Sequence, residues 1–167
     1  VEDGDQGKNR QPHDHNRDYA GISVYASTAA LRAHVPGWSN GKLQVALDLH
    51  CPYIRGRHNE VIYLVGSRDK SIWDEQCRFG AILEDVVDCS LPYAAADNLP
   101  FGEAWNTAEN YTAGKSCSAW MGEQDGVRLA STIEIPYANV GDVMVTPERA
   151  RAFGADLVTA IRRYLSE

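Results

Sequence analysis

The sequence lacks the long hydrophobic runs that membrane-spanning helices need. Apolar stretches such as those at 43–47 and 61–65 are only as long as a strand, whereas a helix that crosses a bilayer needs about 20 apolar residues. An excess of positive charge is also absent, because 23 acidic residues face 16 basic ones and the formal net charge is −7. We therefore expect neither a membrane span nor a nucleic acid or anionic membrane as the main partner.

The cysteine patterns of common metal and redox motifs are missing as well. Four cysteines stand at 51, 77, 89 and 117 without any C-x-x-C pair, so neither a zinc knuckle nor a thioredoxin-like site is predicted. Two disulfides and four free thiols both fit this pattern, and the length and apolar fraction of the chain favour free thiols. The cellular compartment stays open.

The start of the chain has no apolar leader. It begins with Val1 and continues as a polar stretch through Tyr19, which is neither a signal peptide nor an obvious translation start. We interpret Val1 as a cut end.

What is present suffices for one compact domain, since 44% of the 167 residues are apolar. Strand-like segments at 43–49, 60–65 and 127–135 alternate with helical ones at 27–35, 69–89 and 146–167. This order predicts an α/β fold with at least part of the sheet parallel. The nearly continuous apolar character of the first strand indicates an internal position in the sheet rather than an edge. Residues 91–126 are predicted to form a functional loop or one that contains a short helix.

Three details of the helices are also predicted. Asp69 and Thr146 are candidate N-caps of the second and third helices. Pro36 is expected to end the first helix. In the last helix, apolar residues recur at four-residue spacing, as in an amphipathic helix: Phe153, Leu157, Ile161 and Leu165.

Two of the strands end in reactive side chains, where ligands of an α/β sheet gather. His50 follows the strand at 43–49, and Glu134 lies near the end of the strand at 127–135. Asp48 shares the face of His50 and could orient its imidazole, because side chains two apart on a strand point the same way. Taken singly, each of these residues has an ordinary structural interpretation.

The N-terminal loop brings Arg10, Asn16 and Arg17 close together in sequence. Arginine with asparagine suits a carboxylate, because a planar guanidinium supplies two parallel donors and the amide adds another. A solvated turn is the alternative for this loop. The His13-Asp14-His15 triplet is similar to a metal tract, but no further His or Cys flanks it.

Taken in order, these pieces resemble the C-terminal half of a zinc carboxypeptidase of the carboxypeptidase A-like family. The matching segments are Arg10 with 14–17 (DHNR), 48–50 (DLH) and 132–134 (TIE). The resemblance implies a mixed, mostly parallel sheet flanked by helices and a peptidase that uses Zn²⁺ to hydrolyse C-terminal peptide bonds.

The resemblance also implies a role for each matched residue. His50 would be a zinc ligand and Glu134 the general base. Arg10 would stabilise the oxyanion, and Asn16 with Arg17 would bind the substrate carboxylate. Tyr111 is the best candidate for the family's mobile tyrosine, with Tyr93 second.

One family motif does not occur in the chain. The first two zinc ligands of the family come from an upstream H-x-x-E motif, which these residues lack. We therefore expect residues 1–167 to be the C-terminal portion of a single catalytic domain whose N-terminal portion is missing. The alternative is a degenerate relative that cannot hold zinc with three protein ligands. The zinc ligand set would be incomplete, and an open sheet edge would favour association with the missing half or with another copy.

Two other functions remain open from the sequence. A zinc amidase or deacylase could use the same arginines and asparagine to hold a small acylated amino acid. A non-catalytic module could grip peptide C-termini without hydrolysing them.

Overall fold

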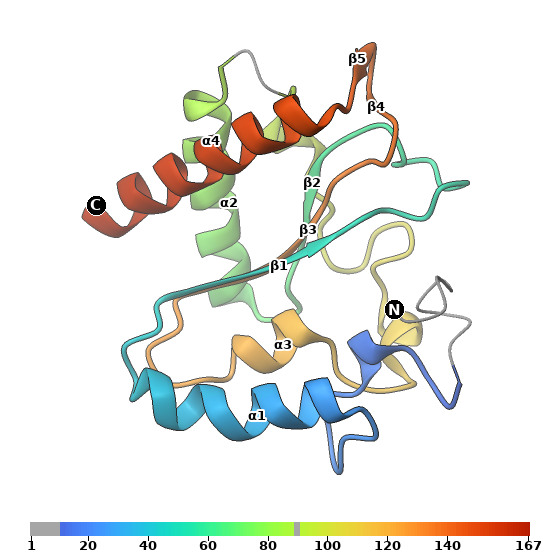
Figure 1. Cartoon of the computed structure of the whole chain (residues 1–167), viewed down its shortest axis with the longest axis vertical. Coiled ribbons are helices and arrows are strands. Elements are labelled where there is room, and N and C mark those ends of the chain that lie inside the picture. The colour runs from blue at the N-terminus through green and yellow to red at the C-terminus, as the bar shows by residue number, and fades with distance from the viewer. Residues whose placement is uncertain (1–10, 89–90) are drawn as a thin grey trace.

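The structure is a computed structural model that describes residues 11–88 and 91–167. Four α-helices and five short strands follow one another along this part of the chain (Figure 1). Their order is α1 (Ala26–Ser39), β1 (Val45–His50), β2 (Tyr63–Val65), α2 (Lys70–Val86), α3 (Cys117–Met121), β3 (Leu129–Glu134), β4 (Asn139–Val140), β5 (Val143–Met144) and α4 (Pro147–Ser166).

The main sheet has three strands in the order β1-β3-β2. Strand β1 runs parallel to β3, and β2 runs antiparallel to it. A separate hairpin pairs β4 with β5. The fold is therefore mixed α/β with a small mixed sheet, as the alternation of helical and strand patterns predicts.

The prediction that the first strand is internal is wrong for the described residues. Strand β1 pairs only with β3 among them, so its other edge is open. The outer edge of β2 is partly covered, because Leu99 donates its backbone N–H to Leu64 and accepts one from Gly66. An apolar run does not specify whether a neighbouring strand is present, and the residues of β1 are only partly buried or exposed.

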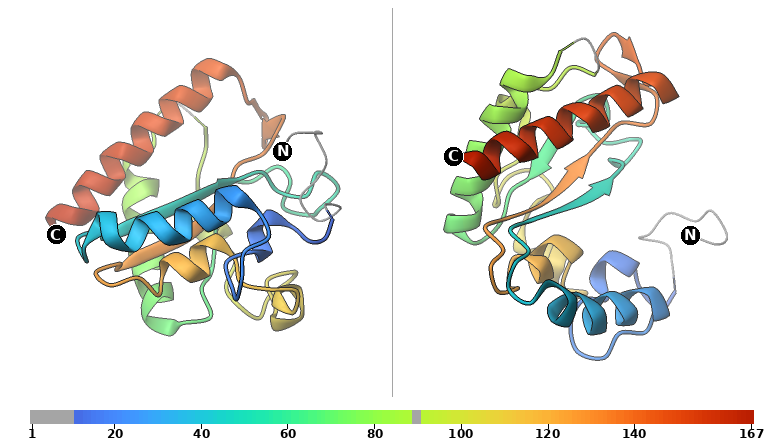
Figure 2. Two further views of the ribbon diagram at one scale, coloured as in Figure 1. Left: turned by 60° about the horizontal axis from the view of Figure 1, so that its bottom comes forward. Right: turned by 60° about the vertical axis from the view of Figure 1, so that its left-hand side comes forward.

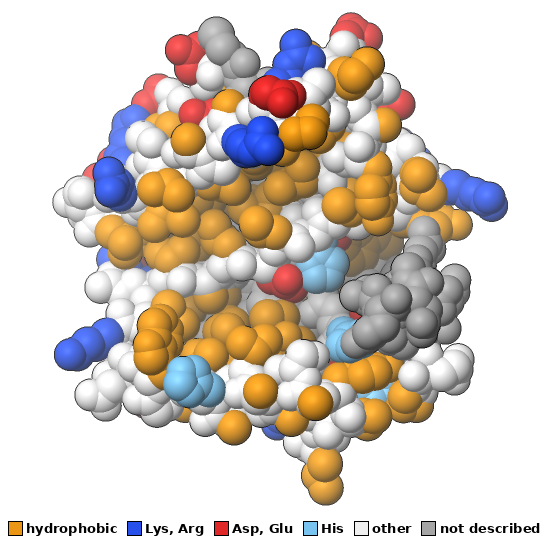
Figure 3. Space-filling model, viewed as in Figure 1, with side chains coloured by type: hydrophobic (Ala, Val, Ile, Leu, Met, Phe, Trp, Pro, Cys, Tyr) orange, Lys and Arg blue, Asp and Glu red, His pale blue; other side chains and the backbone are white. Residues whose placement is uncertain are grey.

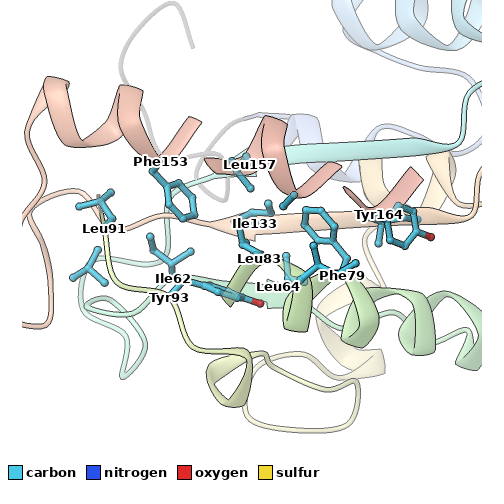
Figure 4. Close-up of a cluster of buried hydrophobic side chains, with 14 residues drawn as sticks. Ile62, Leu64, Phe79, Leu83, Leu91, Tyr93, Ile133, Phe153, Leu157 and Tyr164 are labelled. Atoms are coloured by element: carbon cyan, nitrogen blue, oxygen red, sulfur yellow. The ribbon is translucent and has the colours of Figure 1, made fainter. Parts of the chain in front are cut away.

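Helices cover the two faces of the sheet (Figure 2). Helices α2 and α4 pack together on one face, and the short α3 packs against β1 and β3 on the other. The main core lies between β3 and the first pair of helices, and Figure 4 shows Phe79, Ile133, Phe153 and Tyr164 converging there. A second buried cluster packs Val35 of α1 against Trp120 of α3, together with Tyr19.

The predicted helix starts are confirmed. Asp69 accepts hydrogen bonds from the backbone of Ser71 and Ile72 at the start of α2. Thr146 accepts one from Arg149 at the start of α4. A side-chain oxygen at this position pairs with N–H groups that the first helical turn leaves free.

Two other helix predictions need correction. Helix α1 does not stop at Pro36 but continues to Ser39 and ends at Asn40, whose φ of 46° is left-handed. Proline lacks the backbone N–H that would bond to the preceding turn, but this loss does not prevent the helix from continuing for about one more turn. In α4, Leu165 is 44% exposed, whereas Tyr164 is fully buried. Four residues rotate about 40° beyond one full helical turn, so residues spaced strictly by four move gradually away from the buried face of the helix.

The structure also bears on the expectations about membrane-spanning helices and free cysteines. Within the described ranges, no helix combines the length and apolar character needed to cross a bilayer. Cys51, Cys77 and Cys117 are free thiols. Cys89 lies outside the described residues.

Candidate functional site

The predicted strand-end residues lie side by side. In the strand register His50 is opposite Glu134, and Glu134 is opposite Tyr63. Because residues in register leave the same face of a sheet, the three side chains project toward the side that α3 covers. Glu134 is only 7% exposed in the middle of this row.

This row opens into a cavity of about 1020 Å³. Four of the predicted site residues line it together with Glu134: Asn16, Arg17, His50 and Tyr111. Figure 3 shows the hollow on this face, with acidic and histidine side chains in its middle and hydrophobic ones on both sides. The structure therefore brings together residues from the N-terminal loop, two strands and the long loop before β3. Arg10 lies outside the described residues.

The imidazole of His50 is held from both sides. Its Nδ1 lies 3.1 Å from Oδ1 of Asp48, and its Nε2 accepts a hydrogen bond of 3.2 Å from the Asn16 amide. The contact with the Asp48 carboxylate raises the pKa of His50 against the opposing effect of burial, and the charges of Glu134 and Asp14 add to the increase. Asp48 thus orients the ring so that Nε2 faces the cavity.

Asn16 and Arg17 lie in a single 3₁₀ turn, His15–Arg17, that Asp14 caps by accepting the backbone N–H of Asn16. The Asn16 side-chain oxygen accepts the backbone N–H of Cys117 at 2.7 Å. Arg17 donates to two backbone oxygens, with Nε bonded to Asn110 and Nη1 to Asn16. The amide of Asn16 and the guanidinium of Arg17 are therefore fixed before any ligand arrives.

A close backbone approach holds this turn in place. Gly114 has φ +149°, and a Cβ added to it would lie 2.0 Å from the Arg17 carbonyl oxygen. The neighbouring Lys115 accepts the backbone N–H of Tyr19. Asp18 is 2% exposed and accepts the backbone N–H groups of Val24 and Tyr25.

The two candidates for the mobile tyrosine, Tyr111 and Tyr93, lie in different places, and only Tyr111 is at the cavity. Tyr111 lines the cavity, lies under the Arg17 guanidinium at 4.9 Å from ring centroid to Cζ, and donates its hydroxyl to Asn106. Tyr93 is buried in the main core with its hydroxyl on Asn98, so it is excluded as a residue of this cavity. Burial raises the pKa of Tyr111, and the charge of Arg17 opposes that rise.

The histidines of the possible metal tract make structural contacts. His13 Nε2 lies 2.8 Å from Oδ1 of Asp18. His15 stacks on Tyr25 with ring centroids 3.7 Å apart. Their arrangement supports the turn rather than a shared metal.

Among the described residues, no three His, Cys, Asp or Glu side chains form a group that could hold a metal ion. His50 is thus the one predicted zinc ligand at the cavity. The chain matches no family model and no curated protein.

Several residues of the cavity wall were not singled out from the sequence. Arg57 and His58 line it from the loop that joins β1 to β2, Asn110 lines it from the loop before α3, and Cys117 lines it from the start of α3. The signal for the first pair was available, because loops that follow the carboxyl end of a parallel strand border the ligand crevice. Asn110 and Cys117 carry no comparable signal.

Proposed function

We propose that the protein is a zinc-dependent hydrolase of the carboxypeptidase type, acting on substrates that end in a free carboxylate. The observation that supports this most strongly is the shared cavity of His50, Glu134 and the Asn16-Arg17 pair. Hydrolysis of a peptide bond needs a base and a carboxylate-binding group around one substrate. A mostly parallel carboxypeptidase-like sheet, completed by strands that residues 1–167 do not include, belongs to the same proposal.

In this proposal the substrate carboxylate binds to Asn16 and Arg17. Among the described residues, Nη2 of Arg17 has no hydrogen-bond partner beside the contacts of Nε and Nη1. A charge-assisted hydrogen bond from it to a carboxylate would be about twice as strong as a neutral one. Formation of such a bond would leave the Asn16 amide and the His50 ring close to the substrate, because Asn16 already contacts His50.

Glu134 is proposed as the general base. It takes a proton from a water molecule whose oxygen attacks the carbonyl carbon. It then delivers that proton to the nitrogen of the leaving amine as the carbon–nitrogen bond breaks. Its position between His50 and Tyr63 directs it toward the cavity. Arg10 is proposed to stabilise the oxyanion, as the sequence resemblance implies.

The described residues by themselves do not complete a zinc site. His50 supplies one oriented imidazole, whereas a catalytic zinc usually takes three protein ligands. We propose that the other ligands come from a segment that residues 1–167 do not contain, because the family's H-x-x-E motif does not occur in them. Zinc that survives dialysis of the 167-residue chain against a weak chelator would contradict this incomplete ligand set.

The test of the function compares matched peptides with the longest natural form of the protein. Peptides with a free C-terminal carboxylate should lose their last residue, and the same peptides with an amidated C-terminus should be poor substrates. Cleavage of N-acyl amino acids but not of peptides would indicate the amidase or deacylase instead. Binding of free-carboxylate peptides without turnover would indicate a non-catalytic module.

A further inference from the structure

The cavity carries a second guanidinium that the proposed reaction does not use. Arg57 lines it from the loop joining β1 to β2, whereas Arg17 lies in the N-terminal turn. These two segments flank the carboxyl end of β1 in the views of Figures 1 and 2. The two arginines therefore belong to different walls of one cavity.

The two arginines differ in their partners. Arg17 is held by the backbone oxygens of Asn16 and Asn110 and by the ring of Tyr111. Within residues 11–88 and 91–167, no side chain or backbone group forms a hydrogen bond or ion pair with Arg57. Beside it, His58 packs against the buried ring of Tyr63 with centroids 5.5 Å apart.

The acidic groups of the cavity do not neutralise Arg57. Asp14 accepts the backbone N–H of Asn16 in the N-terminal turn, and Asp48 lies against His50. Glu134 is buried in the row at the strand ends. Arg57 is exposed at the cavity wall, so its charge is available to a ligand.

The size of the cavity allows a ligand to reach both walls. Ligand cavities measure roughly 300–1,000 Å³, and this one has about 1020 Å³. A substrate with its terminal carboxylate on Arg17 and its scissile bond at Glu134 would extend toward the wall formed by the β1–β2 loop. The part that reaches Arg57 is the residue or residues on the amino-terminal side of the scissile bond.

We propose that Arg57 selects substrates with an acidic side chain on the amino-terminal side of the bond that is hydrolysed, with His58 fixing the loop beside it. This inference rests on the proposed function and names its substrate class. The whole chain has a formal net charge of −7, so its overall field repels acidic peptides. A preference for them therefore requires a local cation.

Binding of matched peptides tests this proposal, measured in a Glu134→Gln background to prevent turnover. Two acetylated tetrapeptides with free C-terminal carboxylates would differ only in Glu or Gln at the second-to-last position. We expect the Glu peptide to bind about three- to fivefold more tightly, as for a partly exposed ion pair. High salt should reduce this preference.

Arg55 provides the matched control for Arg57. It is exposed in the same loop but does not line the cavity, and Arg55→Gln changes the net charge by the same amount as Arg57→Gln. We expect Arg57→Gln to abolish the preference for the Glu peptide and Arg55→Gln to retain it. Arg57→Glu should reverse the preference toward a peptide with Lys at that position.

Equal binding of the Glu and Gln peptides to the parent chain would overturn the inference. Equal loss of the preference in Arg55→Gln and Arg57→Gln would also overturn it, because the effect would then reflect net charge. Amidated peptides distinguish this failure from a failure of the proposed function. If amidation of the C-terminus does not weaken binding, the carboxylate site at Arg17 is wrong. If amidation weakens binding but the Glu preference is absent, only the inference about Arg57 is wrong.

Discussion

His50 and Glu134 are register partners on the parallel strands β1 and β3. Their side chains therefore leave the same face of the sheet at the ends where both strands stop. A histidine whose Nδ1 faces Asp48 thus lies next to a carboxylate that is only 7% exposed. This relationship places a potential ligand and a potential base at one end of the same cavity.

Replacement of the proposed base should separate binding from hydrolysis. We expect Glu134→Gln to bind free-carboxylate peptides normally and to lose about 10²- to 10⁴-fold in kcat, because an amide keeps the shape but cannot accept the proton. Steady-state kinetics and a peptide-binding titration would measure the two quantities. Glu60→Gln, at an exposed position, is the control and should keep the parent kcat. Near-normal turnover of Glu134→Gln would remove Glu134 from the mechanism.

Substitution of the carboxylate-binding arginine should act mainly on substrate affinity. Arg17→Lys replaces a fork of donors with a point charge and loses the contacts to Asn16 and Asn110. We expect KM for free-carboxylate peptides to rise about tenfold, corresponding to a lost hydrogen bond between charged groups. Arg162→Lys, on the exposed side of α4, is the control. An equal rise for amidated peptides would contradict the assigned role.

The contact between Gly114 and Arg17 should be intolerant of a methyl group. Gly114→Ala places a Cβ against the Arg17 carbonyl oxygen at a positive φ. We expect a loss of about 1–3 kcal/mol in the free energy of unfolding, together with weaker binding of free-carboxylate peptides. Urea unfolding and the peptide titration would test both effects.

Gly154→Ala is the matched control for this substitution. Gly154 lies inside α4 and has no atom within 4 Å of an added Cβ. The same change should raise stability there by about 0.5–1 kcal/mol, since alanine favours the helix. A similar gain at Gly114 would show that the close approach does not constrain the turn.

The buried carboxylate of Asp18 should make the N-terminal turn sensitive to acid. Burial by itself raises its pKa, but hydrogen bonds from Val24, Tyr25 and His13 outweigh burial and lower the pKa below its usual value of 3.8. The stabilisation is therefore present above the unfolded pKa and is lost as the pH falls through the lower folded pKa. Urea midpoints measured between neutral and strongly acidic pH should fall in that window.

Two variants test this assignment of the acid sensitivity. Asp18→Asn should lower the free energy of unfolding at neutral pH by about 1–3 kcal/mol and flatten its dependence on acidic pH. Asp142→Asn, at an exposed position, should leave both quantities unchanged. An unaltered acid profile in Asp18→Asn would assign the pH dependence to other groups.

The edge of β1 that no described strand covers should promote pairing between chains. When the 167-residue chain is produced by itself, we expect a second copy to pair with this edge, which carries the exposed Leu49 and borders an apolar groove with Trp38 and Leu47. Sedimentation velocity should show concentration-dependent association. Leu49→Lys should weaken it, whereas Val158→Lys, on the exposed side of α4, should not. A monomer at all concentrations would contradict the prediction.

Local chemistry in the sequence determined the helix starts and the existence of the three sheet strands. Asp69 and Thr146 cap their helices by hydrogen bonds within three residues, so no distant contact is needed to predict them. The positions of His50 and Glu134 near strand ends follow from the same local patterns. The expectation that His50 and Glu134 would belong to one site came from the resemblance to zinc carboxypeptidases, in which the matching motifs occur in the same order.

Tertiary structure decided what depends on contacts between distant segments. The edge position of β1 among the described strands depends on which strands pair, and an apolar sequence does not encode that by itself. The separation of Tyr111 from Tyr93 depends on how the long loop folds back onto Arg17. The approach of Arg57 to the same cavity depends on the course of the β1–β2 loop. Side-chain identity limits the chemistry available, but only the packing of the whole chain determines which side chains meet.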